Sequence, residues 1–159
     1  MMTNALRAVK AMGISIQVLE YDYDEDDLSA KAVADKLGLE PDRVFKTLVA
    51  VGDKSGPLMC VVPGSAELDL KKAAKASGNK ALAMLPLKEL EPLTGYLRGG
   101  CSPVGSKKRM PVYVDETATI WESIAVSAGA RGIQMIVEPD DLIRACQGSY
   151  ADIAGYSVP

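Results

Sequence analysis

We expect the chain to fold around one stretch near its middle, TGYLRGGCSPVG (Thr94–Gly105). Four glycines and a proline occur within these twelve residues. Glycine loses more backbone entropy on folding than any other residue, so such a stretch is poorly suited to filling a core. It suits a place where the backbone approaches a bound group, because successive amides in a Gly-Gly turn can accept a carboxylate, a phosphate or an oxyanion. An ordinary tight loop is the alternative interpretation.

A second stretch, VFKTL (Val44–Leu48), places a lysine inside an apolar run. On a strand, Phe45 and Lys46 face opposite ways, so Lys46 can lie half buried at the mouth of a cavity. A lysine there could hold a negative group, act as a base or form a Schiff base. The alternative is a lysine at a strand edge with its ammonium group in water.

The bulk composition indicates one globular domain, residues 1–159, with 48% hydrophobic and 25% charged residues. No apolar run approaches the roughly 20 residues of a membrane helix. The first residues lack the apolar block of a secretory signal. We therefore expect a cytoplasmic protein that does not contact a membrane.

The chain contains no histidine, which removes Ser-His-Asp and Cys-His catalysis and the commonest general base. The three cysteines, Cys60, Cys101 and Cys146, form no Cys-x-x-Cys pair, so neither a zinc site nor a disulfide framework is expected. We expect Cys60 and Cys146 to be buried. Cys101 has no partner that would lower its thiol pKa, which argues against a nucleophile. No metal and no cofactor are predicted.

Charge also limits the possible partners. The net charge of −3 argues against tight, unaided binding of nucleic acid. Six of the 21 acidic residues lie between Glu20 and Asp27, and this segment has no glycine of the kind that a calcium-binding loop requires. A solvated acidic loop is the favoured interpretation.

Spacing and capping residues predict a mixed α/β fold. Helices are expected after the capping residues Thr3, Ser29 and Asp69, over 86–90, and from Pro139 onward. Strands are expected over 14–18, 46–51, 57–62, 81–85, 112–114 and 133–137, and residues 119–126 should turn from a helical piece into a strand. Residues 127–132 read as a second loop of small residues. This irregular order indicates a curved, barrel-like mixed sheet flanked by helices.

Several blocks, taken together and in this order, resemble the YbaK/EbsC family, the free-standing relatives of the editing domain inserted in bacterial prolyl-tRNA synthetases. The blocks run over nearly the whole chain, from about Ile14 to Ile153: FKTL (Phe45–Leu48), LDLKKAAK (Leu68–Lys75), TGYL (Thr94–Leu97), GGCSPVG with KK (Gly99–Gly105 and Lys107–Lys108), and VS with RG (Val126–Ser127 and Arg131–Gly132). The resemblance implies the editing-domain fold and hydrolysis of the ester that joins a wrong amino acid to tRNA.

The resemblance also implies site residues. The family's essential lysine falls on Lys46 and its binding tyrosine on Tyr21, which from the sequence alone could equally be a core residue. The glycine loop falls on Gly99, Gly100, Cys101, Ser102 and Pro103, and the small serine on Ser127. With no histidine to activate them, Ser102 and Ser127 are expected to form hydrogen bonds rather than to attack the ester.

For the YbaK branch the implied substrate is cysteine misplaced on proline tRNA, and Cys-tRNA(Cys) is the alternative cysteinyl substrate. The substrate's own sulfur would attack its ester carbonyl, while Lys46 and the loop amides position the 3′ end of the tRNA. The acidic surface implies that prolyl-tRNA synthetase delivers the substrate. Cys101, Gln134 and the short acidic loop depart from the family pattern and leave the amino acid open. A deacylase for alanine or serine, and a non-catalytic module that binds tRNA or nucleotides, are the alternatives, and the oligomeric state is not predicted.

Overall fold

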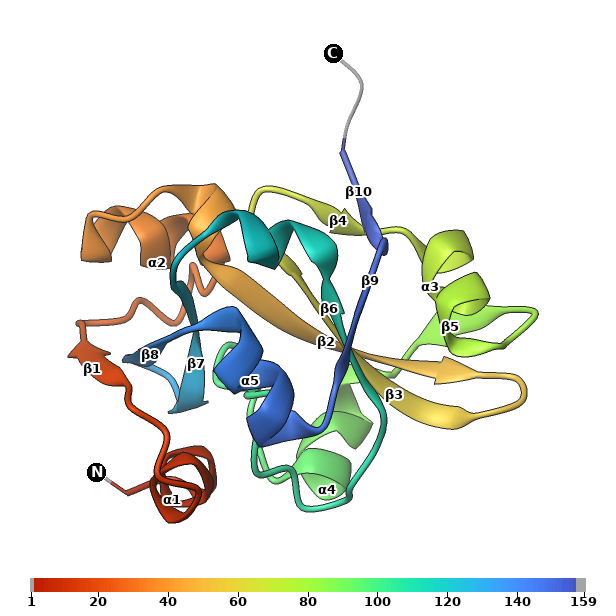
Figure 1. The fold of residues 1–159 in the computed structure, drawn as a ribbon, viewed down its shortest axis with the longest axis horizontal. Coiled ribbons are helices and arrows are strands. Elements are labelled where there is room, and N and C mark those ends of the chain that lie inside the picture. Colours follow the sequence, from red (N-terminus) through yellow and green to blue (C-terminus); the bar gives the residue numbers. More distant parts are fainter. Residues whose placement is uncertain (1, 157–159) are drawn as a thin grey trace.

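Two main β-sheets form the body of the molecule, with β7 and β8 in one and β2 and β3 in the other (Figure 1). The computed structural model describes residues 2–156. The larger sheet has the strand order β5-β2-β3-β6-β9 and the smaller one β1-β8-β7. The larger sheet is formed by β2 (Phe45–Gly52), β3 (Gly56–Pro63), β5 (Leu82–Met84), β6 (Val112–Asp115) and β9 (Ser149–Ala151). The smaller sheet is formed by β1 (Gln17–Glu20), β7 (Ile124–Ala130) and β8 (Ile133–Val137).

The hairpin of β2 and β3 forms the centre of the larger sheet. Its strands pair along their full length, from Phe45 opposite Pro63 to Gly52 opposite Gly56. Asn79 stabilises the turn between β2 and β3: its side-chain oxygen accepts hydrogen bonds of 2.9 Å from the amides of Lys54 and Ser55. The far end of β2 meets the smaller sheet through a parallel bridge between Val44 and Ala125.

The helices begin where the capping residues predict. Thr3, Ser29 and Asp69 each accept a backbone amide in the first turn of α1 (Asn4–Ala11), α2 (Ala30–Leu37) and α3 (Leu70–Ser77). The remaining helical segments are α4 (Leu90–Thr94), α5 (Pro139–Cys146) and the 3-10 turns η1 (Pro41–Arg43), η2 (Leu87–Glu89) and η3 (Glu116–Ile120). A short ladder joins β4 (Glu67–Leu68) to β10 (Ala154–Gly155). Within residues 2–156, no helix is both long and apolar enough to cross a membrane.

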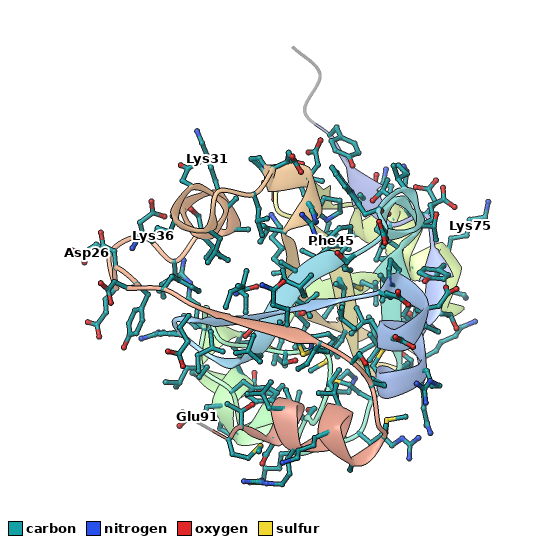
Figure 2. All side chains as sticks on the ribbon, turned by 60° about the vertical axis from the view of Figure 1, so that its left-hand side comes forward. Asp26, Lys31, Lys36, Phe45, Lys75 and Glu91 are labelled. Carbon is teal, nitrogen blue, oxygen red and sulfur yellow. The ribbon has the colours of Figure 1, made fainter. Side chains whose placement is uncertain are left out.

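Three hydrophobic clusters cover the faces of the sheets. The largest lies between the two sheets and includes Phe45, Val61, Val126 and Met135. A second cluster packs α3 on the other face of the larger sheet, and a third packs α2 on the smaller sheet. Phe45 lies inside the molecule, whereas Asp26, Lys31, Lys36, Lys75 and Glu91 project outward (Figure 2).

The predicted mixed α/β class is confirmed, and the curved sheet does not close into a barrel because it is divided into two parts. Three predictions are wrong. The strand predicted over 14–18 lies at Gln17–Glu20, and Cys146, predicted to be buried, is only half buried. Residues 127–130 belong to strand β7, which continues to Ala130 through a register shift. Small side chains are needed there because a Cβ on Gly129 would lie 3.0 Å from the ring of Tyr96. Val18 is also more exposed (44%) than the predicted alternation implies, since β1 is an edge strand.

Candidate functional site

A cavity of about 340 Å³ opens where the two sheets separate beyond the Val44–Ala125 bridge. Its size falls within the range typical of small-molecule sites, roughly 300–1,000 Å³. Its wall is built from four parts of the chain: the start of α2, strand β2, the segment from β5 to α4, and the glycine loop. Ser127 of β7 and Gln134 of β8 complete it.

Strand β2 presents an open edge to this cavity. The Val49 carbonyl accepts a 3.0 Å hydrogen bond from the amide of Leu85, so the odd-numbered residues of β2 direct their backbone groups toward β5. Strand β5 pairs only with Ala50–Gly52. The backbone groups of Thr47 therefore point to an edge that β5 leaves uncovered.

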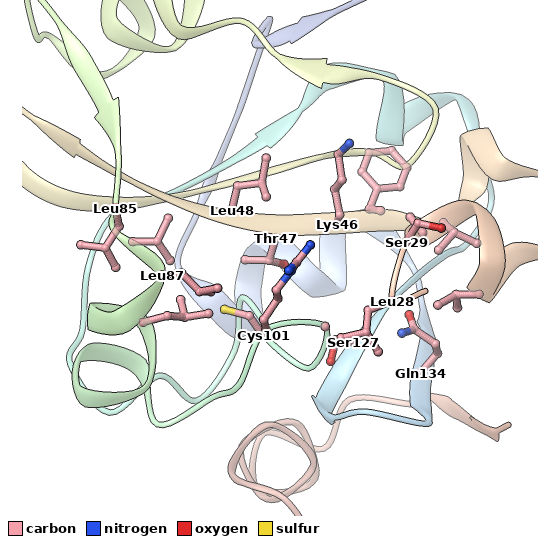
Figure 3. A pocket seen from close by; sticks show the side chains of 18 of the residues that line it. Leu28, Ser29, Lys46, Thr47, Leu48, Leu85, Leu87, Cys101, Ser127 and Gln134 are labelled. Carbon is pink, nitrogen blue, oxygen red and sulfur yellow. The ribbon is translucent and has the colours of Figure 1, made fainter. Parts of the chain in front are cut away.

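Lys46 lies at the mouth of the cavity. Its side chain and that of Thr47 leave β2 on opposite sides, and the ammonium group of Lys46 points away from Cys101 and Ser127 (Figure 3). The residue is half buried and lines the cavity. Among the residues that the structure describes, its ammonium group makes no ion pair.

Three contacts fix the glycine loop through the residues that flank it on either side. The Tyr96 hydroxyl donates a 2.7 Å hydrogen bond to the Val104 carbonyl, and the Arg131 Nε donates a 2.8 Å bond to the Arg98 carbonyl. Gly105 lies against α1, where an added Cβ would be 2.8 Å from the Asn4 backbone. Gly105 also has a φ of +78°, which glycine adopts without strain.

Only part of the loop faces the cavity. Gly99 and Cys101 line it, whereas Gly100, Ser102 and Pro103 are not part of its wall. The Gly100 amide donates to the Leu97 carbonyl within a turn, and the Ser102 hydroxyl accepts from the Val104 amide. In the described part of the chain, no carbonyl accepts from the amides of Gly99 or Cys101, so these two remain as donors.

Cys101 is a wall residue whose thiol stays protonated because it is buried. Its side chain is buried, and this desolvation raises the pKa of the thiol to about 12. The thiolate is the nucleophilic form, so at neutral pH almost none of it is present. The loop thus offers amide donors but no ionised nucleophile.

Ser127 and Gln134 form a cross-strand pair on β7 and β8. Both are buried and both line the cavity. The Ser127 hydroxyl accepts a 3.1 Å hydrogen bond from the amide of Gly129. The side-chain oxygens of Gln134 and Thr47 are buried without a hydrogen-bond partner in the described structure.

Tyr21 lies beside the main cavity and not in its wall. It lines a smaller hollow that shares Leu28, Val33 and Gly99 with the main cavity. Thr47, Gln134 and Arg98 are lining residues that our sequence analysis did not assign to the site. The polar Gln134, the second residue of the otherwise apolar stretch Ile133–Val137, was the available signal.

The two ends of the cavity differ in character (Figure 3). Leu48, Leu85 and Leu87 lie together at one end, and Ser127, Gln134 and Ser29 lie toward the other, with Thr47 and Cys101 between them. No group of three or more side chains of the metal-binding kind occurs among the described residues. The arrangement fits an elongated organic ligand with one apolar and one polar part.

Comparison with known proteins gives consistent results. Residues 24–145 match the model of the family described as the aminoacyl-tRNA editing domain. The chain is 51% identical to EbsC of Enterococcus faecalis, assigned as a Cys-tRNA(Pro)/Cys-tRNA(Cys) deacylase, over 95% of this chain and 92% of EbsC.

Two more distant similarities, one in sequence and one in structure, also lead to proteins connected with prolyl-tRNA synthetase. The chain is 34% identical to the proline–tRNA ligase of Shouchella clausii over 65% of this chain, which corresponds to 18% of that larger enzyme. A crystal structure assigned as a trans-editing enzyme for prolyl-tRNA synthetase superimposes with a TM-score of 0.84 at 28% identity, covering 98% of this chain and 99% of that one.

Proposed function

Because the chain belongs to the aminoacyl-tRNA editing domain family, we propose that it is a deacylase that hydrolyses the ester of Cys-tRNA(Pro). The observation that carries this proposal is the cavity that joins Lys46 at its mouth to the free amides of Gly99 and Cys101. The scissile ester lies at the loop, with its carbonyl oxygen directed at these amides. One such donor contributes roughly 3 kcal/mol to stabilising a developing oxyanion.

The nucleophile comes from the substrate. The cysteinyl sulfur attacks its own ester carbonyl, so that a sulfur–carbon bond forms and the bond from carbon to the ribose oxygen breaks. The thiol proton leaves with solvent and the ribose oxygen takes up a proton, which yields free tRNA and a four-membered thiolactone that water opens to cysteine. Positioning the sulfur and the carbonyl is the protein's main contribution, and such positioning contributes several kcal/mol.

We assign Lys46 to the terminal phosphate of the tRNA. Its ammonium group points outward from the mouth and away from Cys101, where the nucleic acid must enter. This orientation suits a point charge that holds a phosphate better than a base that acts at the ester. Arg98 is the other cationic residue of the wall and adds a second positive charge to it.

The apolar end of the cavity suits the adenine of the terminal adenosine. Met84 and Leu87 line this end and are 44% and 59% exposed, although both are apolar. An aliphatic surface that stays open to solvent beside a polar ester site can cover the face of a base. The amino acid then occupies the polar end.

Delivery of the substrate requires a partner. The net charge of −3 gives little general affinity for the tRNA backbone, so we propose that prolyl-tRNA synthetase hands over the mischarged 3′ end in the cytoplasm.

A panel of charged tRNA(Pro) species tests the proposed function. We expect multiple-turnover release of cysteine from Cys-tRNA(Pro) and at least about a hundredfold slower release of alanine, serine and proline, because these lack the thiol that attacks the ester. Faster release of alanine or serine than of cysteine would identify a different deacylase. Saturable binding without turnover on every member would contradict an enzyme.

A further inference from the structure

Two buried oxygen atoms in the cavity wall have no hydrogen-bond partner. They are Thr47 Oγ1 on β2 and Gln134 Oε1 on β8, and Gln134 is only 4% exposed. In the described part of the chain, Ser106 Oγ is the one other buried side-chain oxygen or nitrogen of this kind, and it lies outside the cavity wall. Both atoms are enclosed by their neighbours, so a ligand reaches them when the side chains of Thr47 and Gln134 turn toward the cavity that both residues line. Leaving such an atom unpaired costs about 1–3 kcal/mol, so an enclosed pair in the wall of one cavity points to a ligand that draws these side chains toward it and supplies the missing donors.

We propose that Thr47 and Gln134 bind the α-amino group of the aminoacyl ester and so determine which aminoacyl group is accepted. This inference rests on the proposed function and adds a specificity site to it. The two residues lie on strands of different sheets that face each other across the polar part of the cavity. The α-amino group is the part of an aminoacyl ester that brings two hydrogen-bond donors on one atom, and both oxygens can accept.

The charge around the site favours the neutral amine. No carboxylate lines the cavity among the described residues, whereas Lys46 and Arg98 do. Cations nearby disfavour a second positive charge, and a buried ammonium group without an anion is costly. A neutral primary amine has two N–H groups, one for each of the two acceptors.

This geometry discriminates against the correct amino acid of tRNA(Pro). The nitrogen of a prolyl ester is closed into a ring, so its neutral form carries a single N–H group. Binding it leaves Thr47 or Gln134 unpaired. Sites that hydrogen-bond a substrate N–H reject analogues without it far more strongly than a small difference in size allows.

The experiment combines enzyme and substrate changes. The substrates are Cys-tRNA(Pro) and its desamino analogue, 3-mercaptopropionyl-tRNA(Pro), which keeps the thiol and the ester. We expect the wild-type enzyme to favour the amino-bearing substrate by about tenfold or more in kcat/KM. This preference should collapse toward unity in Gln134→Leu and in the isosteric Thr47→Val.

Three further variants control the result. Thr47→Ser keeps a hydroxyl and should keep the preference, and Ser106→Ala removes the unpartnered oxygen outside the cavity and should also keep it. Gln134→Glu keeps an acceptor but has no amide N–H donor, so it should preserve the preference if Gln134 accepts. Loss of the preference in Gln134→Glu would overturn the assignment of Gln134 as an acceptor.

The possible failures are distinguishable. If the wild-type enzyme hydrolyses Cys-tRNA(Pro) but shows the same preference as Gln134→Leu and Thr47→Val, the amino-group site is wrong and the deacylase function stands. If it hydrolyses neither substrate, the deacylase function fails and the amino-group site with it.

Discussion

At the scale of single residues, Lys46 and Thr47 are neighbours in the chain but serve different parts of the cavity. One places a cation at the mouth and the other an uncharged oxygen in the polar wall, because consecutive residues of a strand point to opposite sides. The apolar neighbours of Lys46 in the sequence indicated a half-buried lysine at the mouth of a cavity. It gave no comparable reason to single out Thr47, since the unpaired edge of β2 arises only from the short length of β5.

Removing the cation at the mouth tests its role. We predict that Lys46→Ala lowers kcat/KM for Cys-tRNA(Pro) by at least about tenfold, because a charge-assisted contact contributes about 1.5–3 kcal/mol. The matched control is Lys54→Ala in the hairpin turn at the other end of β2. Equal activity of the two variants in a steady-state deacylation assay would rule out a phosphate contact at Lys46.

The thiol of Cys101 allows a second test at this scale. Since burial raises its pKa to about 12, we predict that iodoacetamide at pH 7.5 leaves Cys101 unmodified in the folded protein and modifies it once the chain is unfolded in urea. Mass spectrometry of peptides from both samples measures the difference. Rapid modification in the folded state would show an accessible thiolate and reopen covalent catalysis by the protein.

At the scale of elements, caps and turns were readable from the sequence and the pairing of distant strands was not. Ser29 and Gly38 mark both ends of α2 because they satisfy local backbone groups. The pairing of Ser127 with Gln134 depends on β7 continuing past Ser127 into residues that look like a loop. Tertiary packing of Tyr96 and Thr3 against Gly129 overrides that local preference.

The glycine loop depends on its contact with α1, which a matched pair of glycine variants can test. Gly105 and Gly56 have similar φ values of +78° and +74°, but an added Cβ meets the Asn4 backbone at 2.8 Å only at Gly105. Both alanine variants should lose about 1–2 kcal/mol through the left-handed conformation. We predict that Gly105→Ala loses a further 1–3 kcal/mol or so through overpacking, measured by urea denaturation. Equal losses would mean that the loop does not rest on α1.

At the scale of the whole molecule, the cavity exists because two sheets share one bridge and then separate. The class of fold could be predicted from the mixture of hairpins and helices. The division of the sheet could not, since it depends on a single bridge between Val44, just before β2, and Ala125 of β7. The acidic segment near residues 22–27 is exposed, as the sequence predicts, and projects away from the core (Figure 2).

The net charge of −3 leads to a prediction about delivery of the tRNA. At physiological ionic strength we expect adding prolyl-tRNA synthetase to lower the KM for Cys-tRNA(Pro), while kcat changes little, because the synthetase supplies tRNA contacts that this acidic protein lacks. A synthetase that charges another amino acid serves as the control. An unchanged KM would mean that the deacylase finds its substrate alone.

Attack by the substrate's own sulfur is tested most directly by comparing single-turnover deacylation of Cys-tRNA(Pro) with that of S-methylcysteinyl-tRNA(Pro). The methyl group blocks the sulfur and leaves the ester and the α-amino group intact. If the protein only positions the ester at the loop amides and the tRNA at Lys46, the methylated substrate should react at least about a hundredfold more slowly, since aligned intramolecular attack is lost. Equal rates for the two substrates would contradict the account and require a nucleophile that is not the substrate's own thiol.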